Sequence, residues 1–258
     1  MKFVKKDIEE SRGHQVVKHN DLIQKSRYEL SLQEHRIILY LISKIKPDDK
    51  IFHEYTFKIK DFCEVCGMDE TSGKNYALLK QTMDNLTDKK NWIILKDQNG
   101  GEWETTLRWI EKVAINKKSG IIKIRIDSDM TPYLLKLKRK FTSYSLYFTL
   151  AMKSKYSIRL YELLKSYENL IEYEFEIENL KILLSAEKYK LFGNFQDKVL
   201  SIAKREINDY SDILISYELE KQGRKFHKIK FLINPKYKEK FDESIRTWKN
   251  INRVLNKK

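Results

Sequence analysis

The sequence predicts an α+β protein with two tandem winged-helix domains that are related by an internal pseudo-repeat. Three observations carry this prediction. Residues 153–233 can be assigned in order to a helix, a helix-turn-helix and a β-hairpin, which is the element order of a winged helix. A similar order of elements occurs about 120 residues earlier. The net charge of +14 is concentrated in the second half of the chain.

The first expected element is a helix over residues 31–45. Ser31 and Glu34 have the spacing of a capping box, and the apolar residues that follow recur at helical intervals until Pro47 ends the helix. Alternating apolar and polar residues then predict a half-buried strand from Tyr55. The other elements of this half are a short helix, a longer helix and two hairpins, expected at residues 61–65, 73–88, 92–109 and 113–126.

Residues 129–150 are expected to form a basic helix that connects the two domains. Pro132 suits the first turn of such a helix, and a run of four cations follows it. This run consists of Lys136, Lys138, Arg139 and Lys140. The second domain then follows as an amphipathic helix, a strand with a short helix, a further helix and a hairpin, expected at residues 153–167, 173–186, 195–209 and 212–233.

Two alignments of the chain with itself support the pseudo-repeat. Residues 55–62 align with residues 173–180 at an offset of 118, and their apolar positions stay in step. An offset of 121 continues the match, although Met83 then meets Lys204. At this offset four apolar residues, Leu79, Leu86, Trp92 and Ile94, meet Leu200, Ile207, Ile213 and Ile215.

The charge distribution points to an acidic partner for the second half. Residues 1–130 carry 24 Lys and Arg against 21 Asp and Glu, whereas residues 131–258 carry 27 against 16. The nearly balanced first half could therefore serve a protein partner as easily as DNA. Because no apolar run approaches the roughly 20 residues of a membrane span, and no signal peptide opens the sequence, we expect a cytoplasmic protein without a membrane partner.

The helix at residues 195–209 is the candidate for reading DNA. Its apolar stripe should face the core and consists of Phe195, Val199, Ile202, Ala203 and Ile207. The opposite face offers donors suited to base edges in a major groove. The predicted contacts on and next to this helix are Asn194, Gln196, Lys198, Ser201, Lys204 and Arg205. The alternative is a solvated basic face without a ligand.

Further DNA contacts are predicted around this helix and in the first domain. The tip of the second hairpin holds only positive charges between Lys221 and Lys230, and two lysines lie near the start of the helix at 153–167. On the helix at 73–88, polar residues lie opposite the apolar side. The residues assigned to DNA in these places are Lys221, Arg224, Lys225, Lys228, Lys153, Lys155, Lys74, Lys80 and Gln81.

Other chemistry is poorly supported by the sequence. Cys63 and Cys66 form a single pair without further cysteines, so ordinary packing is favoured over a metal or redox site. Arg159 is expected to pair with an acid such as Glu162 or Glu206 rather than to contact DNA. The sequence shows no phosphate loop, HExxH, GxSxG or paired His motif, and we expect no enzyme activity, no cofactor and no metal. With fifteen tyrosines, a nucleophilic tyrosine of a nicking enzyme stays an alternative.

Several strings in the sequence resemble the initiator Rep proteins of theta-replicating, iteron-carrying plasmids. They lie between about residues 16 and 235. The strings are His19-Asn20-x-Leu22, Leu32-x-x-x-Arg36-Ile37-Ile38-Leu39-Tyr40, Ser154-x-Tyr156-Ser157-x-Arg159-Leu160-Tyr161-Glu162-Leu163-Leu164, Ala203-x-x-Glu206-Ile207-Asn208 and Lys221-x-Gly223-Arg224-Lys225.

The resemblance implies a plasmid replication initiator that binds directly repeated origin DNA, the iterons. It implies that monomers open the origin and help to recruit the host initiator and helicase, while dimers repress and so control copy number. We accordingly expect a flexible N-terminus (1–15), a first domain for dimerisation and auxiliary DNA contact (16–128), the connecting helix (129–150), a main DNA-binding domain (151–235) and a tail (236–258). A transcriptional repressor without a replication role is the main alternative.

Overall fold

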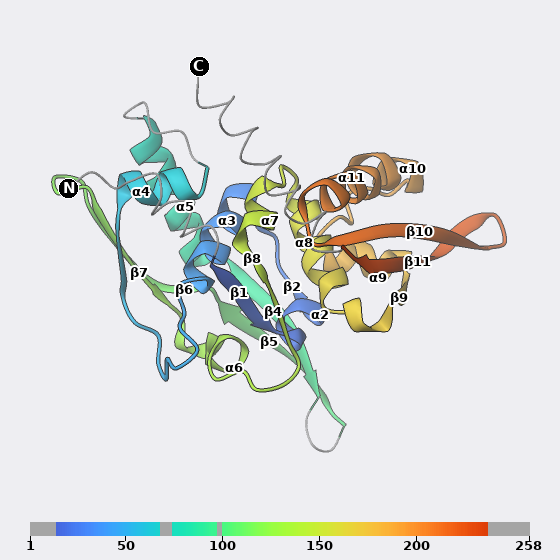
Figure 1. Cartoon of the computed structure of the whole chain (residues 1–258), viewed down its shortest axis with the longest axis horizontal. Helices are drawn as coiled ribbons and strands as arrows, with labels where there is room; N and C mark the ends of the chain where they lie inside the picture. The colour runs from blue at the N-terminus through green and yellow to red at the C-terminus, as the bar shows by residue number, and fades with distance from the viewer. Residues whose placement is uncertain (1–13, 68–73, 97–99, 237–258) are drawn as a thin grey trace. The chain divides into compact units, whose positions relative to one another are not determined.

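The computed structural model describes residues 14–67, 74–96 and 100–236, which form two compact units, Met1–Leu146 and Tyr147–Lys258 (Figure 1). We call these the first unit and the second unit. The expectations for residues 1–13 and for the tail at 237–258 fall outside the described ranges.

The first unit contains the following elements: β1 (Gln15–His19), α2 (Asn20–Gln24), β2 (Ser26–Arg27), α3 (Leu32–Ile42), β3 (Tyr55–Lys58), α4 (Ile59–Val65), α5 (Lys74–Asp88), β4 (Lys90–Lys96), β5 (Glu102–Arg108), β6 (Ile110–Asn116), β7 (Ile121–Ile126), η1 (Ser128–Met130), α6 (Thr131–Leu134) and β8 (Phe141–Ser145). Its strands form three antiparallel sheets, with the orders β1-β8, β2-β4-β5 and β3-β7-β6.

The helix and hairpins expected in the first half are confirmed, although α3 ends at Ile42 rather than at Ile45, with Ser43 as its C-cap residue. Ser31 caps α3 as a capping box: its hydroxyl accepts the Glu34 N–H at 3.3 Å, and its own N–H donates to the Glu34 carboxylate at 2.6 Å. Both hairpins, β4–β5 and β6–β7, form where the turn residues indicated. The short helix α4 begins at Ile59 and not at Asp61, because Lys58 occupies the N-cap position.

The second unit is smaller, and its order of elements is that of a winged helix. Its elements are α7 (Leu146–Ala151), which starts at the last residue of the first unit, then α8 (Lys155–Lys165), η2 (Glu168–Leu170), β9 (Glu172–Glu176), α9 (Ile177–Leu183), α10 (Phe192–Phe195), the π-helical turn η3 (Gln196–Leu200), α11 (Ser201–Tyr210), β10 (Ile213–Gln222) and β11 (Lys225–Pro235). The sheet order is β10-β11-β9, and the β10–β11 hairpin extends away from the helices of this unit (Figure 1).

The pseudo-repeat is confirmed in topology, but one part of the expected alignment is wrong. The strand-helix pairs β3–α4 and β9–α9 match, and each strand pairs with the second strand of a hairpin, in the orders β3-β7-β6 and β9-β11-β10. The helix α5 packs on β6 as α11 packs on β10. The first-unit counterpart of the β10–β11 hairpin is therefore β6–β7, and Trp92 and Ile94 belong to an additional hairpin in another sheet.

Residues 129–150 do not form the expected connecting helix. Its helical parts are the single turns η1 and α6 and most of the short helix α7, and the strand β8 lies between α6 and α7. Pro132 does lie in the first turn of α6, but this helix ends at Leu134. The strand β8 pairs with β1 in the first unit, and this non-local pairing outweighs the local helical preference. The basic run at 136–140 is consequently a loop between α6 and β8.

Candidate nucleic-acid interface

The helix predicted to read DNA runs without a break through α10, η3 and α11, and we call residues 192–210 the reading helix. Its apolar stripe faces the core as expected: Phe195, Val199, Ala203 and Ile207 are all fully buried. The fifth member of the predicted stripe, Ile202, is only half-buried. Leu200 and Glu206, which lie between these anchors, are buried as well, and the exposed positions of the helix lie on its opposite side.

Four polar residues spaced by three or four positions are exposed along the reading helix. We call them the helix stripe: Asn194, Lys198, Ser201 and Arg205. Lys204 is also exposed, and its Nζ lies 5.8 Å from the centre of the Tyr217 ring on β10. Gln196, in contrast, is half-buried, so the structure does not group it with the helix stripe. Within the stripe, the cations suit guanine edges or phosphates and Asn194 suits adenine.

Aromatic side chains join the start of the reading helix to the hairpin. The rings of Phe192 and Phe226 have centroids 4.6 Å apart, and the Lys221 Nζ lies 4.9 Å from the centre of the Phe226 ring. Aromatic and cation–π contacts of this kind each contribute about 0.5–1.5 kcal/mol. These contacts hold the part of the hairpin next to its tip beside the N-terminal end of the reading helix.

Two residues hold the C-terminal part of the reading helix: Asn208, which the sequence analysis did not assign, and Glu206, which it considered only as a partner of Arg159. The Asn208 amide donates to the Ile215 carbonyl at 3.0 Å and accepts the Ile215 N–H at 2.7 Å, so it pairs with β10 as another strand would. The buried Glu206 accepts the N–H groups of Lys153 and Ser154, each at 3.2 Å, at the start of α8. Both residues lie in the string Ala203-x-x-Glu206-Ile207-Asn208, one of the strings that carry the family resemblance. This string was the signal in the sequence from which their importance could have been inferred.

A further network fixes α8 against the start of β10. The Tyr161 hydroxyl donates to Asp212 at 2.8 Å, and Lys165 bridges Asp212 and Glu168 at 2.8 and 2.6 Å. Burial raises the pKa of Tyr161, and the Asp212 charge raises it further. Burial opposes the charge on Lys165, but the carboxylates of Asp212 and Glu168 prevail and raise its pKa. Both shifts move the pKa further above neutral pH, so Tyr161 stays uncharged and Lys165 stays charged there.

The tip of the β10–β11 hairpin presents three exposed cations. Gln222 pairs with Lys225, so Gly223 and Arg224 form a two-residue turn. Gly223 has φ +64°, a conformation that glycine adopts without steric cost. A register shift between Glu220 and Lys221 separates the tip from the regular hairpin. We call Lys221, Arg224 and Lys225 the wing tip; all three are exposed.

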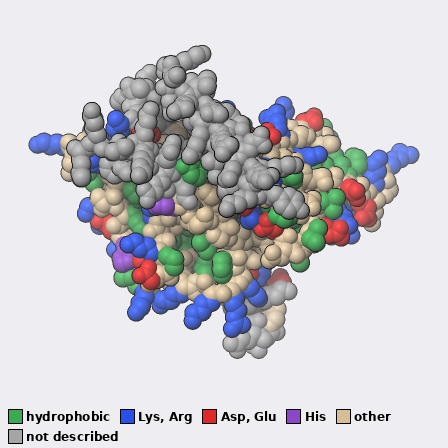
Figure 2. All heavy atoms as spheres, in the orientation of Figure 1, with side chains coloured by type: hydrophobic (Ala, Val, Ile, Leu, Met, Phe, Trp, Pro, Cys, Tyr) green, Lys and Arg blue, Asp and Glu red, His purple; other side chains and the backbone are tan. Residues whose placement is uncertain are grey.

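Lys228 and Lys230 do not belong with the wing tip, which corrects the uniform positive charge expected between Lys221 and Lys230. Lys228 is paired with Glu174 at 2.8 Å and Lys230 with Glu172 at 2.8 Å, both across the β11–β9 pairing. These hydrogen bonds raise the pKa of both lysines. Figure 2 accordingly shows blue side chains at the far end of the hairpin and red ones nearer its base.

The start of α8 holds the other two cations assigned to DNA in the second unit. Lys153 is exposed just before the N-cap residue Ser154, and Lys155 is half-buried with its Nζ 5.3 Å from the centre of the Tyr156 ring. Arg159 is 2% exposed, and its Nε donates to the Leu183 carbonyl at 3.1 Å. This burial agrees with a structural role for Arg159, whereas its expected pairing with Glu162 or Glu206 stays a prediction.

In the first unit, α5 occupies the position of the reading helix. Lys80 and Gln81 are exposed on it, while the side chain of Lys74, its first residue, lies outside the described part. The β6–β7 turn adds two exposed lysines that the sequence analysis left out, Lys117 and Lys118. The Lys117 Nζ lies 5.3 Å from the centre of the Tyr76 ring on α5, so hairpin and helix meet here too.

Features of other protein classes are not seen in the described ranges. Cys63 and Cys66 are both buried and form no disulfide, in agreement with the packing role favoured from the sequence. Among the described residues, no three His, Cys, Asp or Glu side chains are grouped as a metal site would require. No helix in this part of the chain is both long and apolar enough to cross a membrane.

Comparisons with known proteins agree with this architecture. A protein of Escherichia coli described as an uncharacterized 27.6 kDa protein is 22% identical over 222 residues, covering 81% of this chain and 91% of that protein. The PI protein of Escherichia coli is 31% identical over 147 residues, covering 50% of this chain and 48% of that protein. In the crystal structure of the Pi initiator protein in complex with iteron DNA, the protein has the same fold, with a TM-score of 0.66 and 23% identity over 87% of this chain and 98% of that chain.

Family models account for most of the sequence. Residues 15–165 match the model of the WH1 domain of initiator replication proteins, and residues 176–233 match that of the WH2 domain of initiator Rep proteins. The WH1 match extends through α8, whereas in the structure α8 packs on α11 of the second unit. Together the two matches span both units, and the chain therefore belongs to the initiator Rep protein family, with its two winged-helix domains in tandem.

Proposed function

We propose that this protein is a plasmid replication initiator that binds directly repeated origin DNA and has no catalytic activity of its own. The observation that carries the proposal is the helix stripe beside the wing tip, on the second winged helix of an initiator Rep protein. A helix of this size fits the major groove, and a hairpin with three cations suits the adjacent phosphates. The relative of the same fold that was crystallised with iteron DNA supports the choice of ligand.

The two domains are assigned different tasks in this proposal. The second, residues 151–235, makes the main base contacts, and the first, residues 16–128, provides auxiliary contacts through α5 and the β6–β7 turn. The first domain also mediates self-association, and dimers repress the protein's own gene. Monomers on the origin open the duplex and contact the host initiator and helicase. The near balance of charge in residues 1–130 suits protein partners.

A footprint on the DNA that flanks the gene tests the proposal. We expect protection of several evenly spaced direct repeats, and replication of a plasmid that carries those repeats when the protein is supplied in trans. Protection of one promoter site without replication would instead make the protein a transcriptional repressor. Cleavage of supercoiled DNA with a covalent tyrosine adduct would contradict the absence of catalysis.

Replacing Arg205 by Ala should weaken binding to the specific repeat by about 1–3 kcal/mol and relax the preference at one base pair, because a bidentate contact to a base edge would be lost. The same result is expected for Lys198→Ala at another position of the repeat. Binding to a panel of single-substitution duplexes measures both effects. An equal loss on every duplex would reassign the residue to a phosphate.

Replacing Arg224 and Lys225 by Ala should weaken binding to any duplex. The slope of log affinity against log salt concentration should fall by about 1 for each lost phosphate contact. Lys228→Ala is the matched control, because this lysine is already neutralised by Glu174 and should change the slope little. The slopes are measured by fluorescence anisotropy on specific and scrambled duplexes. A larger effect of Lys228→Ala than of the double variant would refute the role of the wing tip.

A further inference from the structure

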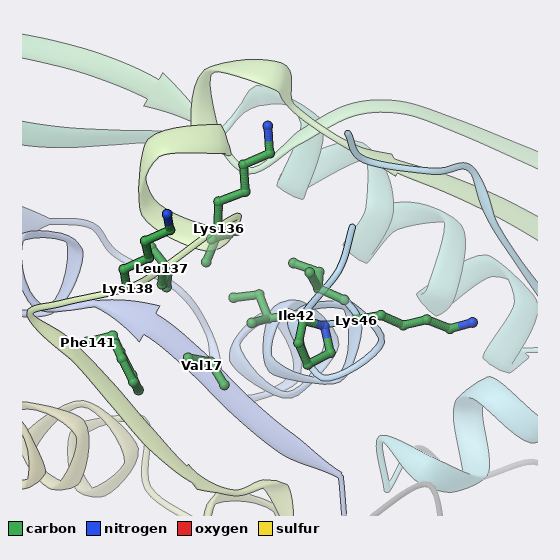
Figure 3. Close-up of a pocket in the computed structure, with 10 residues that line it drawn as sticks. Val17, Ile42, Lys46, Lys136, Leu137, Lys138 and Phe141 are labelled. Atoms are coloured by element: carbon green, nitrogen blue, oxygen red, sulfur yellow. The ribbon is translucent and has the colours of Figure 1, made fainter. Parts of the chain in front are cut away.

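The first unit contains an apolar cavity of about 420 Å³ that the proposed DNA contacts do not use (Figure 3). Its walls come from β1, the C-terminal end of α3 and the segment from α6 to β8. The apolar lining includes Val17, Ile42, Leu134, Leu137 and Phe141. Sites for small molecules typically measure about 300–1,000 Å³ and are lined mainly by apolar side chains with a few polar groups. The cavity has the size and the walls of such a site.

The charged residues of the lining are all lysines. Lys46, Lys136 and Lys138 border the cavity, and no acid is among its lining residues. Lys136 and Lys138 come from one loop, whereas the Lys46 side chain extends away from the other labelled residues (Figure 3). Within the described ranges, neither Lys136 nor Lys138 forms an ion pair, and both are exposed. The mouth of the cavity thus has a positive charge that no carboxylate of the lining neutralises.

The loop that carries these lysines has a defined and unusual backbone. Lys136 and Lys140 have φ angles of 53° and 50°, in the left-handed region that non-glycine residues seldom adopt. The Lys140 carbonyl accepts the Asn20 N–H at 2.6 Å, which ties the end of the loop to the start of α2. Such backbone strain persists only where the surrounding structure enforces it, and it is frequent at ligand sites. The backbone of this loop is therefore held in a defined conformation beside the cavity, which both Lys136 and Lys138 line.

We propose that this cavity binds an amphiphilic anion, a molecule with an apolar body and a carboxylate or phosphate head. The body occupies the space between Val17, Ile42 and Leu137, where burial of each methylene is favourable. The head lies at Lys136 and Lys138, where a charge-assisted hydrogen bond forms without competition from an acid of the lining. A neutral head would forgo that bond, and a cationic head would be repelled. The proposal is independent of the proposed DNA binding.

Calorimetric titration of the intact protein without DNA tests the site, with decanoate, decanol and decyltrimethylammonium as probes at concentrations below micelle formation. We expect one saturable site for decanoate, weaker binding of decanol and none of decyltrimethylammonium. Shortening the chain to octanoate should weaken binding roughly fourfold for each methylene removed, from about 0.8 kcal/mol per buried CH₂. An inorganic phosphate titration separates the head from the body, because the head alone should not show saturable binding.

Two variants localise the site. Lys136→Gln with Lys138→Gln should weaken decanoate binding about tenfold or more and leave decanol binding unchanged, because hydrogen bonds to charged groups contribute about 1.5–3 kcal/mol. The matched control, Lys90→Gln with Lys112→Gln, removes two exposed lysines elsewhere in the first unit and should have no effect. Val17→Trp fills the cavity from a half-buried strand position and should abolish binding, with circular dichroism to verify folding.

Three results would overturn the proposal. They are the absence of saturable decanoate binding to the unaltered protein, equal affinity for the three decyl probes, and equal weakening by the control pair of lysines. The last two would identify non-specific adsorption to exposed apolar surface.

Discussion

Raising the salt concentration from about 50 to about 200 mM should weaken duplex binding by about 10³- to 10⁵-fold, as for proteins that contact six to ten phosphates. The second unit has enough cations for this number of phosphate contacts, even when the ion-paired Lys228 and Lys230 are excluded. Lys198 and Arg205 are left out as well, because they are assigned to base edges, and the remaining candidates are Lys153, Lys155, Lys204, Lys221, Arg224 and Lys225. Each phosphate contact releases condensed counterions, and this release becomes less favourable as bulk salt rises.

The measurement is a series of anisotropy titrations across that salt range, on a repeat-containing duplex and on a scrambled duplex of equal length. The scrambled duplex should show a similar slope at lower affinity, because phosphate contacts carry no sequence information. An affinity that hardly changes with salt on both duplexes would contradict the proposed interface. It would show that these cations do not contact phosphates.

Replacing Phe195 by Ala should destabilise the second unit by about 3–5 kcal/mol, the usual cost of removing a buried aromatic side chain. Phe195 is fully buried, meets Phe192 with ring centroids 6.4 Å apart and lies under the Lys181 Nζ, which is 5.7 Å from the centre of its ring. A cavity at this position would loosen the N-terminal half of the reading helix. Hydrogen exchange at the β11 amides of Ile229 and Phe231 reports the free energy of opening of this unit.

Arg205→Ala is the matched control for this experiment, because it lies on the same helix but is exposed. It should change stability by less than about 0.5 kcal/mol and still weaken specific binding. The two variants together separate loss of the fold from loss of contacts. Equal stability of the Phe195 variant and the unaltered protein would show that this side chain does not anchor the helix.

Local signals predicted most elements of the fold. The Ser31–Glu34 spacing determines the start of α3, because both bonds of a capping box form within one turn. Residues 99–101 and 117–120 indicated the turns of both first-unit hairpins. The buried stripe of the reading helix followed from its period. The failure at 129–150 has a non-local cause: β8 pairs with β1, more than 120 residues away, and no local pattern records that partner.

The candidate site was predicted less completely than the fold. Asn194, Lys198, Ser201 and Arg205 are exposed together as expected, but Gln196 is half-buried at the π-helical turn. Gln196 is the first residue of this turn, where the helical period changes, so its partial burial does not follow from a uniform period. The positioning roles of Glu206 and Asn208 depend on backbone groups of α8 and β10, which are distant in the chain.

The sequence by itself determined the two winged helices, the excess of positive charge in the second half and the face of the helix that could meet DNA. These properties arise from periodicity and composition, which are local or additive along the chain. Only the tertiary structure decided which charges remain available. Strand β9 brings Glu174 and Glu172 to Lys228 and Lys230, while the turn at Gly223 carries Arg224 and Lys225 beyond reach of those acids. Neutralisation depends on distances of a few ångströms, and these are set by pairing between strands far apart in sequence.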